Sequence, residues 1–145
     1  MKAYFDSSAL VKRYVLEKGT ESVLAICQQA DELGISIIGY PEITSALCRL
    51  RREGKITSSQ YLFSKESIAR DLRDAVLCPM AESTVLLSLL LLEENPLRAM
   101  DAIHVAAAVE WQADIFVSGD MDQIKAAKKA GLKVKAVGVL HAKVV

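Results

Sequence analysis

Residues 1–14 read MKAYFDSSALVKRY, and this stretch indicates how the chain begins to fold. Its apolar run Ala3–Phe5 has the length and composition of a buried β-strand, and the Asp-Ser-Ser that follows ends the strand. Four more short apolar runs of the same character lie farther along, at residues 35–38, 76–78, 115–117 and 133–137. Longer amphipathic segments, which are typical of helices, separate these runs.

Short strands that alternate with helices pair in parallel, and helices then cover both faces of the sheet. The sequence therefore predicts a three-layer α/β/α fold whose parallel sheet has about five strands. The predicted helices cover residues 42–53, 57–75, 81–94, 98–112 and 121–130. Gly54 suits a left-handed cap of the first helix, and Thr57–Gln60 has the form of a capping box at the start of the second. The segment 81–94 carries leucines on all sides, so we expect it to be deeply packed.

The composition limits the classes of protein to consider. The 145 residues include 18 Lys and Arg against 18 Asp and Glu, so the formal net charge is zero. This balance argues against a nucleic-acid binder that relies on gross positive charge, but a nuclease with a local basic strip stays possible. Hydrophobic residues make up 52% of the chain, which is enough to form one core and too many for a disordered chain. We therefore expect one domain over residues 1–145.

The cysteines and the apolar segments point to the cytoplasm. Cys27, Cys48 and Cys78 lie far apart, without a CxxC pair or a Cys/His cluster, so neither a disulfide framework nor a zinc site is predicted. The longest uncharged apolar run, residues 83–92, has about half the roughly 20 residues that a membrane-spanning helix needs. The N-terminus has no apolar signal core. We expect a soluble cytoplasmic protein without a membrane partner.

Acidic residues follow the predicted strands. Asp6 ends the first strand, Glu42 begins the helix after the second, and Asp120 ends the fourth. A fourth acid, Asp101, stands early in the helix that leads into the fourth strand, among small and apolar neighbours. Ligands of parallel sheets collect at the carboxyl ends of the strands. If the first and fourth strands are neighbours, all four carboxylates converge at one edge of the sheet.

Converging carboxylates need a counter-charge. Two of them about 4 Å apart repel by roughly 4 kcal/mol at an effective dielectric constant of 20. Protons, cationic side chains or metal ions must therefore neutralise such a cluster. Oxygen ligands without His or Cys suit Mg²⁺ or Mn²⁺, and these ions activate water and stabilise the charge of a phosphodiester transition state. The pattern thus suggests metal-assisted phosphodiester cleavage.

Three of the four acids also have a simpler interpretation than a shared metal site, as caps or charges at helix ends. Asp6 could be an N-cap, Glu42 could complement a helix dipole, and either Asp120 or Asp122 could cap the helix that follows. Capping serves Asp101 poorly, because its helix has already begun. A shared pocket explains all four acids together, whereas the simpler interpretations need a separate coincidence for each.

At these residues the sequence resembles the PIN-domain family, and specifically the small ribonuclease toxins of VapBC-type toxin–antitoxin pairs. The resemblance covers nearly the whole chain, and the order and spacing of its motifs agree as well as the motifs themselves. These motifs are YFDSSALVKRY at 4–14, YPEITSALCRLRREGKIT at 40–57, LRAMDAIHVAAAVEW at 97–111 and IFVSGDMDQIKAAKKAGLKV at 115–134.

The resemblance implies a metal-dependent endoribonuclease, in which water activated by Mg²⁺, or by Mn²⁺ as a substitute, hydrolyses RNA. It implies that Asp6, Glu42, Asp101 and Asp120 are both the catalytic residues and the metal ligands, with Asp6 and Asp101 as the core ligands. Ser118 is a departure, because the family more often has Thr there, but its hydroxyl can still orient a carboxylate. A cognate antitoxin and a homodimer are expected on the same ground.

Several points stay open at the level of sequence. Whether Asp122 joins the site is undecided. Arg49 and Arg52 share a helix face and either contact RNA phosphates or complement the helix dipole. His104, three residues after Asp101, either tunes the cluster or has a structural role. Alternatives to the toxin are a catalytically weak PIN module that binds RNA or protein, and a stand-alone RNA-processing nuclease.

Overall fold

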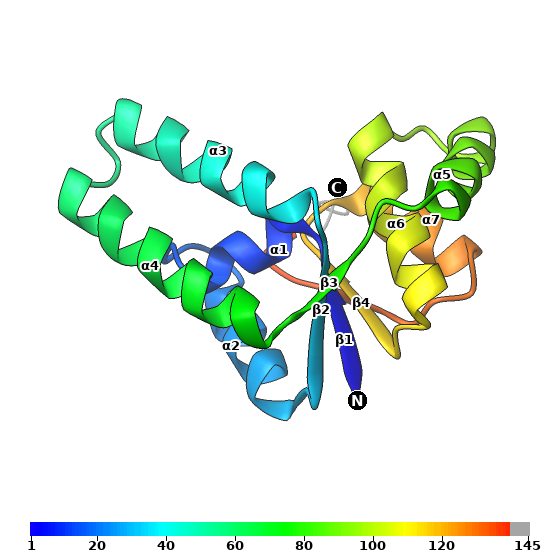
Figure 1. Cartoon of the computed structure of the whole chain (residues 1–145), viewed down its shortest axis with the longest axis horizontal. Coiled ribbons are helices and arrows are strands. Elements are labelled where there is room, and N and C mark those ends of the chain that lie inside the picture. Colours follow the sequence, from blue (N-terminus) through cyan, green and yellow to red (C-terminus); the bar gives the residue numbers. More distant parts are fainter. Residues whose placement is uncertain (140–145) are drawn as a thin grey trace, which may run out of the picture.

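A computed structural model of the chain describes residues 1–139, and its five strands form one parallel sheet (Figure 1). The strands lie in the order β3-β2-β1-β4-β5, so β1 is central and pairs with both β2 and β4. Their bounds are β1 Lys2–Phe5, β2 Glu32–Ser36, β3 Val76–Cys78, β4 Ile115–Ser118 and β5 Val134–Ala136. The prediction of a parallel sheet of about five strands is confirmed. The first and fourth strands are neighbours, which is the condition for the four acids to converge.

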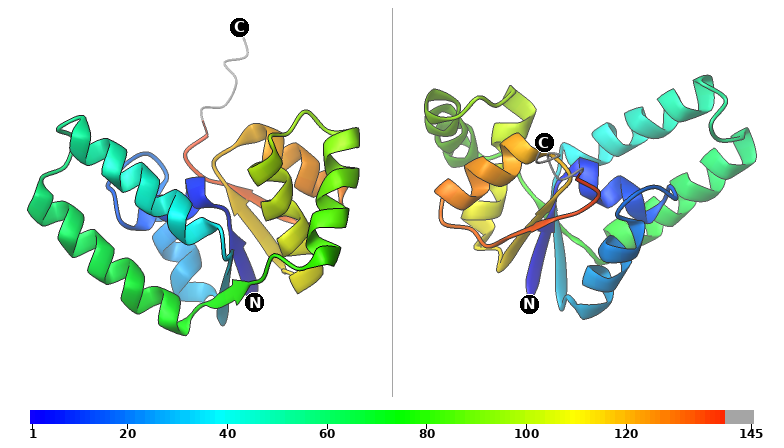
Figure 2. Two further views of the ribbon diagram at one scale, coloured as in Figure 1. Left: turned by 45° about the horizontal axis from the view of Figure 1, so that its top comes forward. Right: turned by 180° about the vertical axis from the view of Figure 1, so that it is seen from behind.

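The helices form the two outer layers. One layer holds α1 (Ser7–Leu10), the 3-10 turn η1 (Val11–Arg13), α2 (Thr20–Gln29), α3 (Gly39–Arg52) and α4 (Ser58–Asp74). The other layer holds α5 (Glu82–Glu94), α6 (Ala99–Trp111) and α7 (Met121–Lys129). A tilted view and a view from behind show the sheet between these layers, with α3 and α4 extending away from it as an antiparallel pair (Figure 2). The three-layer α/β/α prediction is therefore confirmed.

Two cores fill the spaces between the layers. On the side of α1 to α4, Phe5, Ile35, Ile43 and Ile68 are buried together with Leu47. On the side of α6 and α7, the aromatic rings of the central strands pack against a run of small residues on α6, which lets this helix approach the sheet closely. The main members of this second core are Tyr4, Phe116, Ala102, Val105, Ala106 and Ala108.

The second strand lies earlier in the chain than the predicted range 35–38. β2 ends at Ser36, Ile37 is 51% exposed, and α3 begins at Gly39. Gly39 makes this early start possible, because a Cβ atom there would collide with the side chain of Ile35. The chain therefore turns from strand to helix within two residues, and Glu42 falls in the first turn of α3.

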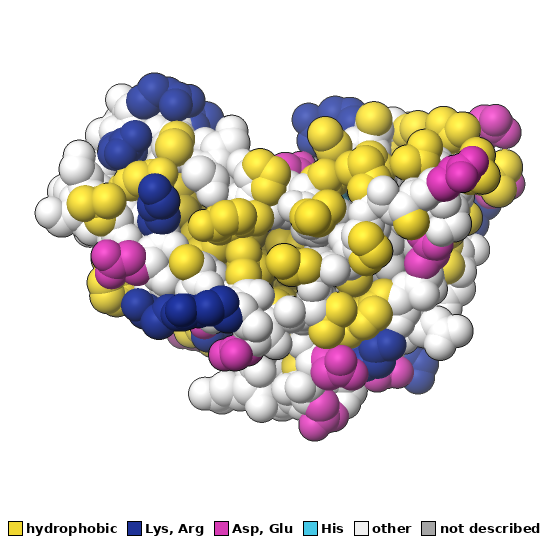
Figure 3. Space-filling model, in the orientation of Figure 1, with side chains coloured by type: hydrophobic (Ala, Val, Ile, Leu, Met, Phe, Trp, Pro, Cys, Tyr) yellow, Lys and Arg dark blue, Asp and Glu magenta, His cyan; other side chains and the backbone are white. Residues whose placement is uncertain are grey.

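The expectation that segment 81–94 is deeply packed is wrong. α5 packs on α6 rather than on the sheet, so nothing in the described chain covers its outer side. Its exposed aliphatic side chains are Val85, Leu86, Leu89 and Leu90, at 39%, 56%, 49% and 57% exposure. Figure 3 shows hydrophobic side chains gathered over this part of the surface.

Other sequence predictions can be compared with the structure. The capping box at Thr57 is formed with Gln60, and Gly54 has a positive φ of 72° after α3. Helix α2 was not expected from the sequence, because its buried positions, Thr20, Val23 and Ile26, make only a narrow face. Cys27, Cys48 and Cys78 are free thiols, and burial raises the pKa of Cys78 to about 11. None of the described helices combines the length and the apolar character needed to cross a membrane.

Candidate functional site

Asp6 lies at the carboxyl end of the central strand and is completely buried. It is the N-cap of α1, because its Oδ1 accepts a hydrogen bond of 2.9 Å from the backbone N–H of Ala9. The Ser8 hydroxyl lies 2.8 Å from both carboxylate oxygens, and the Ser118 hydroxyl donates to Oδ2 at 2.7 Å. Asp6 is thus a helix cap, as the simpler interpretation has it. The three contacts from the Ser8 and Ser118 hydroxyls are additional to the capping hydrogen bond.

These contacts stabilise a charge that burial opposes. Burial raises the pKa of the Asp6 carboxyl, and the hydrogen bonds from Ser118, Ala9 and Ser8 only partly reverse this effect. The net pKa stays above its ordinary value. A nearby cation would favour the ionised form further.

Ser118 and Asp120 continue the site from the neighbouring strand β4. The Ser118 hydroxyl, while donating to Asp6, accepts the backbone N–H of Asp120 at 3.0 Å. Asp120 is the N-cap of α7, since its Oδ1 accepts the backbone N–H groups of Asp122 and Gln123 at 2.9 and 3.1 Å. Of the two candidate caps for this helix, Asp120 is therefore the actual one, and Asp122 is exposed in the first turn.

Asp101 is 9% exposed in the first turn of α6. Its Oδ1 accepts the side-chain amide Nε2–H of Gln123 at 3.1 Å, and its Oδ2 lies 3.3 Å from Nε of Arg98, whose side chain is largely exposed. Gln123 therefore connects two of the acids, because its backbone is capped by Asp120 and its side chain holds Asp101.

Glu42 faces the site from α3. Its Oε1 accepts the Ser7 hydroxyl at 2.8 Å and lies 2.6 Å from Nε2 of His104. Burial acts to raise the pKa of Glu42, but the hydrogen bonds from His104 and Ser7 outweigh it, so the pKa is lowered. His104 in turn contacts the Tyr4 hydroxyl, which stays protonated because burial raises the pKa of Tyr4 well above its ordinary value.

All four predicted acids thus belong to one connected set of residues at the carboxyl edge of the sheet. Gln123 joins Asp101 to Asp120, Ser118 joins Asp120 to Asp6, and Ser7, the residue after Asp6, joins the first strand to Glu42. Within residues 1–139, however, no three Asp, Glu, His or Cys side chains are close enough to hold a metal ion as they stand. Hydrogen-bond donors of the protein contact all four carboxylates instead.

The donor set nevertheless suits a hard divalent cation. The four acids offer only carboxylate oxygens, which Mg²⁺ and Mn²⁺ prefer. Beside Asp101, the Oε1 atom of Gln123 is a buried acceptor, and within the described chain no hydrogen-bond donor reaches it. A hydrated cation at this edge would supply the donor that Oε1 lacks. The chemistry of the residues present therefore fits the cation.

Some of these residues were not recognised in the sequence. The sequence pattern assigns Ser7 and Ser8 only to the end of a strand, and it does not predict that Gln123 or the Tyr4 hydroxyl belongs to the site. The spacing from Asp120 to Gln123, an acid followed three residues later by Gln, resembles a capping box and was the available signal for Gln123.

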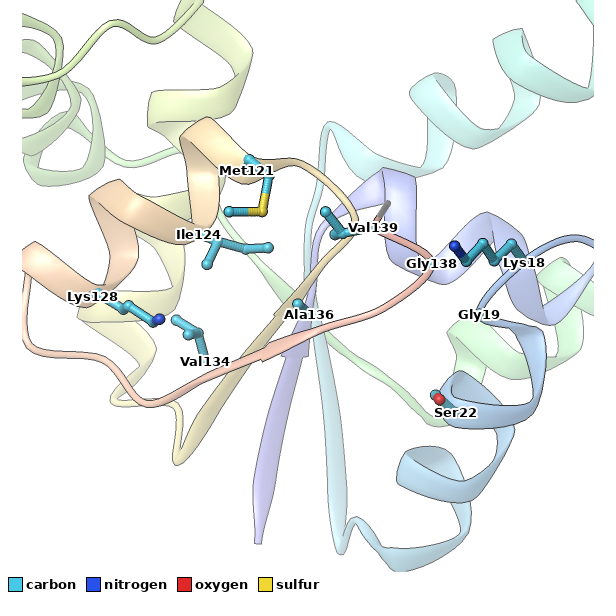
Figure 4. A pocket seen from close by; sticks show the side chains of 10 residues that line it. All are labelled: Lys18, Gly19, Ser22, Met121, Ile124, Lys128, Val134, Ala136, Gly138 and Val139. Atoms are coloured by element: carbon cyan, nitrogen blue, oxygen red, sulfur yellow. The ribbon is translucent and has the colours of Figure 1, made fainter. Parts of the chain in front are cut away.

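The arginines at the end of α3 and a pocket beside α7 do not belong to the set of acids. Arg49, Arg51 and Arg52 occupy the last turn of α3, toward the tip of the extended α3–α4 pair, where Lys and Arg side chains gather in Figure 3. Arg51 also lies over the ring of Tyr61, with Cζ 4.1 Å from its centroid. A pocket of about 550 Å³ between the start of α2, α7 and β5 contains none of the four acids (Figure 4).

Comparison with known proteins gives the family. A model of the PIN domain matches residues 3–129, which is most of the chain. The chain belongs to the PIN-domain family. No curated protein sequence matches this PIN domain.

Solved structures show the same fold at low sequence identity. The PIN domain is similar to a toxin–antitoxin complex from Klebsiella pneumoniae, with a TM-score of 0.64, 17% identity and coverage of 83% of this chain and 88% of that one. For VapBC2 from Rickettsia felis, bound to a DNA fragment from its promoter, the TM-score is 0.67 at 12% identity, with coverage of 94% of this chain and 99% of that one. For Mycobacterium tuberculosis VapC20, described as a toxin that cleaves the sarcin-ricin loop, the TM-score is 0.65 at 12% identity, with coverage of 86% of this chain and 94% of that one.

Proposed function

We propose that this PIN domain is a metal-dependent endoribonuclease that hydrolyses RNA phosphodiester bonds, and that it is the toxin of a toxin–antitoxin pair. The observation that carries the proposal is the connected set of four acids at the carboxyl edge of the sheet, with Asp6 and Asp120 directly after β1 and β4. The membership in the PIN family supports it, and so does the similarity to VapC20, which is described as cleaving the sarcin-ricin loop.

In this proposal Asp6, Glu42, Asp101 and Asp120 hold the divalent cation, with Mg²⁺ as the ion and Mn²⁺ as a substitute. The cation, when bound, supplies positive charge that makes water a better nucleophile and offsets negative charge developing on the phosphate. Asp6 contributes the most rigid carboxylate, because backbone and hydroxyl donors fix both of its oxygens. Asp101 would exchange its weak contact with the exposed Arg98 for the cation.

The partners follow from the same comparisons. Structures similar to this PIN domain are toxin–antitoxin complexes, so we propose a cognate antitoxin for this chain. We also propose that residues 1–145 are a single domain, that two copies form a homodimer, and that the protein acts on RNA in the cytoplasm.

The experiment is cleavage of a mixed RNA pool by the purified protein with Mn²⁺ and with EDTA. We expect cleavage only with the metal, and loss of it in Asp101→Asn by about 100-fold or more, since even partners outside the ligand shell contribute about 10–100-fold. The variant should fold, because an Asn side chain still accepts from Gln123 and only an exposed ion pair is lost.

Asp74→Asn is the matched control, because Asp74 is exposed at the end of α4, away from the site. It should cleave like the wild type. Normal cleavage by Asp101→Asn would contradict the assigned site. Failure of the wild type to cut RNA with any metal would favour the alternative, a PIN module that only binds RNA or protein.

A further inference from the structure

His104 is buried at the site, but the proposed hydrolysis of RNA assigns no role to this residue. Its side chain is almost wholly buried on α6, between Tyr4 of β1 and Glu42 of α3. The contact with Glu42 joins the two helical layers at the carboxyl edge of the sheet, since α3 and α6 cover opposite faces (Figure 1). The inference below rests on the proposed function of this site.

The hydrogen bonds around His104 have a definite direction. The backbone N–H of Ser36 donates to the Tyr4 oxygen at 3.0 Å, so this oxygen acts as an acceptor. The Tyr4 hydroxyl lies 2.8 Å from Nδ1 of His104, and within the described chain no other acceptor is found for its proton. Tyr4 therefore donates to Nδ1, and a neutral ring then carries its proton on Nε2.

The Tyr4 ring is itself held in place. It stacks on Phe116 with ring centroids 5.6 Å apart and planes 8° from parallel, and it meets the imidazole edge-on with centroids 6.0 Å apart. The hydroxyl position is thus fixed by packing as well as by the bond from Ser36. This fixes the orientation of the imidazole, whose Nε2 faces Oε1 of Glu42 at 2.6 Å and lies farther, at 3.3 Å, from the Ser7 hydroxyl.

Both contacts of Glu42 fall on the same carboxylate oxygen. Oε1 receives the Ser7 hydroxyl at 2.8 Å and faces Nε2 of His104 at 2.6 Å, which is the short distance of a charge-assisted hydrogen bond. For Oε2, no hydrogen-bond donor is found among residues 1–139. One oxygen of Glu42 is therefore held by the protein while the other keeps its lone pairs for a ligand.

We propose that the Tyr4–His104 pair is a positioning device that fixes Oε1 of Glu42 and so directs Oε2 toward the divalent cation. His104 stands three residues after Asp101 on α6, so the same helix that presents one acid orients another from the opposite layer. His104 acts through Glu42 and is not itself a catalytic residue.

Two substitutions of His104 separate positioning from packing. The amide of Gln reaches about as far as Nε2, and the amide of Asn reaches about as far as Nδ1. His104→Gln therefore keeps a donor for Glu42, whereas His104→Asn keeps a partner only for Tyr4. Both variants lose the ring, so any general effect on packing is common to the two.

The first measurement is the dissociation constant of Mn²⁺ for the wild type, His104→Gln and His104→Asn, with folding checked by thermal unfolding in EDTA. We expect the Gln variant to bind within about threefold of the wild type and the Asn variant to bind about 10–100-fold more weakly, as found when partners of metal ligands are removed. Equal Mn²⁺ affinity of the two variants would overturn the proposal. Absence of Mn²⁺ binding by the wild type would instead overturn the proposed metal site, and the positioning role with it.

The second measurement does not depend on metal. Long-range ¹H–¹⁵N NMR spectra identify which ring nitrogen is protonated, and the chain has only two histidines, so His141→Gln leaves the His104 signal alone. We expect a protonated Nε2. An Nε2 without a proton would overturn the proposal even if the Asn variant did not fold.

Discussion

Ser118 is where two strands of the site are joined through a single hydroxyl group. It is completely buried, donates to the buried carboxylate of Asp6 and accepts the backbone N–H of Asp120. The family resemblance implies Thr at this position, and Thr carries the same hydroxyl group as Ser. The departure seen in the sequence therefore preserves the group that contacts Asp6.

Ser118→Ala should lower the free energy of unfolding by about 1.5–3 kcal/mol, because it removes a hydrogen bond to a buried charged group. Ser118→Thr should cost less than Ala, since only a methyl group is added. Denaturant unfolding at neutral pH measures both, with Ser22→Ala, at an exposed position, as a control expected within about 0.5 kcal/mol of the wild type. Equal stability of Ser118→Ala and the wild type would show that the hydroxyl does not stabilise Asp6.

At the scale of elements, η1 is tied to α4 through Asp71. Oδ2 of Asp71 accepts hydrogen bonds from Nε of Arg13 at 2.8 Å and from the Tyr14 hydroxyl at 2.7 Å. Burial alone would raise the pKa of Asp71, but the hydrogen bonds from Arg13 and Tyr14 and the charges of Arg13 and Arg70 outweigh it, and the pKa is lowered. The ionised carboxylate therefore holds the long α4 against the start of the chain.

This contact makes a pH-dependent contribution to stability. The folded pKa lies below the unfolded value of about 3.9, so the stabilisation is complete above the unfolded pKa and is lost as pH falls through the folded one. Asp71→Asn should cost on the order of 1 kcal/mol at pH 7, a modest amount because the Asp71 side chain is 33% exposed. Denaturant unfolding from pH 7 to pH 2.5 should show the difference from wild type shrinking below about pH 4. A difference that stays constant over this range would contradict the role of the ionised carboxylate, and Asp74→Asn on the same helix is the control.

At the scale of the whole molecule, the outer side of α5 is apolar and unpartnered within the described chain. Exposed aliphatic side chains of this kind gathered together mark a contact surface in soluble proteins. In the proposed homodimer, we expect a second copy to cover the α5 surface formed by Val85, Leu86, Leu89 and Leu90. The leucine-rich sequence of α5, which predicts a buried helix, would then be buried only in the dimer.

The double variant Leu86→Lys, Leu90→Lys should convert the dimer into a monomer, because two charges would have to be buried in the interface. Light scattering coupled to size-exclusion chromatography measures the mass of each form. Leu62→Lys, on the equally exposed apolar position of α4, is the control and should leave the mass unchanged. A double variant that keeps the mass of the wild type would exclude α5 from the interface.

The sequence by itself determined the alternation of strands and helices, the parallel sheet, the capping box at Thr57 and the identity of the four acids. These features depend on local patterns, namely apolar periodicity, turn residues and the order of motifs. The strands, helices and cap are each encoded within a few neighbouring residues, and the four acids stand in short motifs whose order along the chain can be read directly.

Only the tertiary structure decided which residues surround the acids and which helix faces are covered. Tyr4, His104 and Glu42 come from β1, α6 and α3, and Gln123 reaches Asp101 across 22 residues of sequence, so no local pattern could pair them. α5 likewise has a core-like sequence but stands outside α6, and its exposure depends on where the other elements lie. The physical reason is the same in each case: contacts between distant segments arise from the packing of layers, which short-range sequence patterns do not encode.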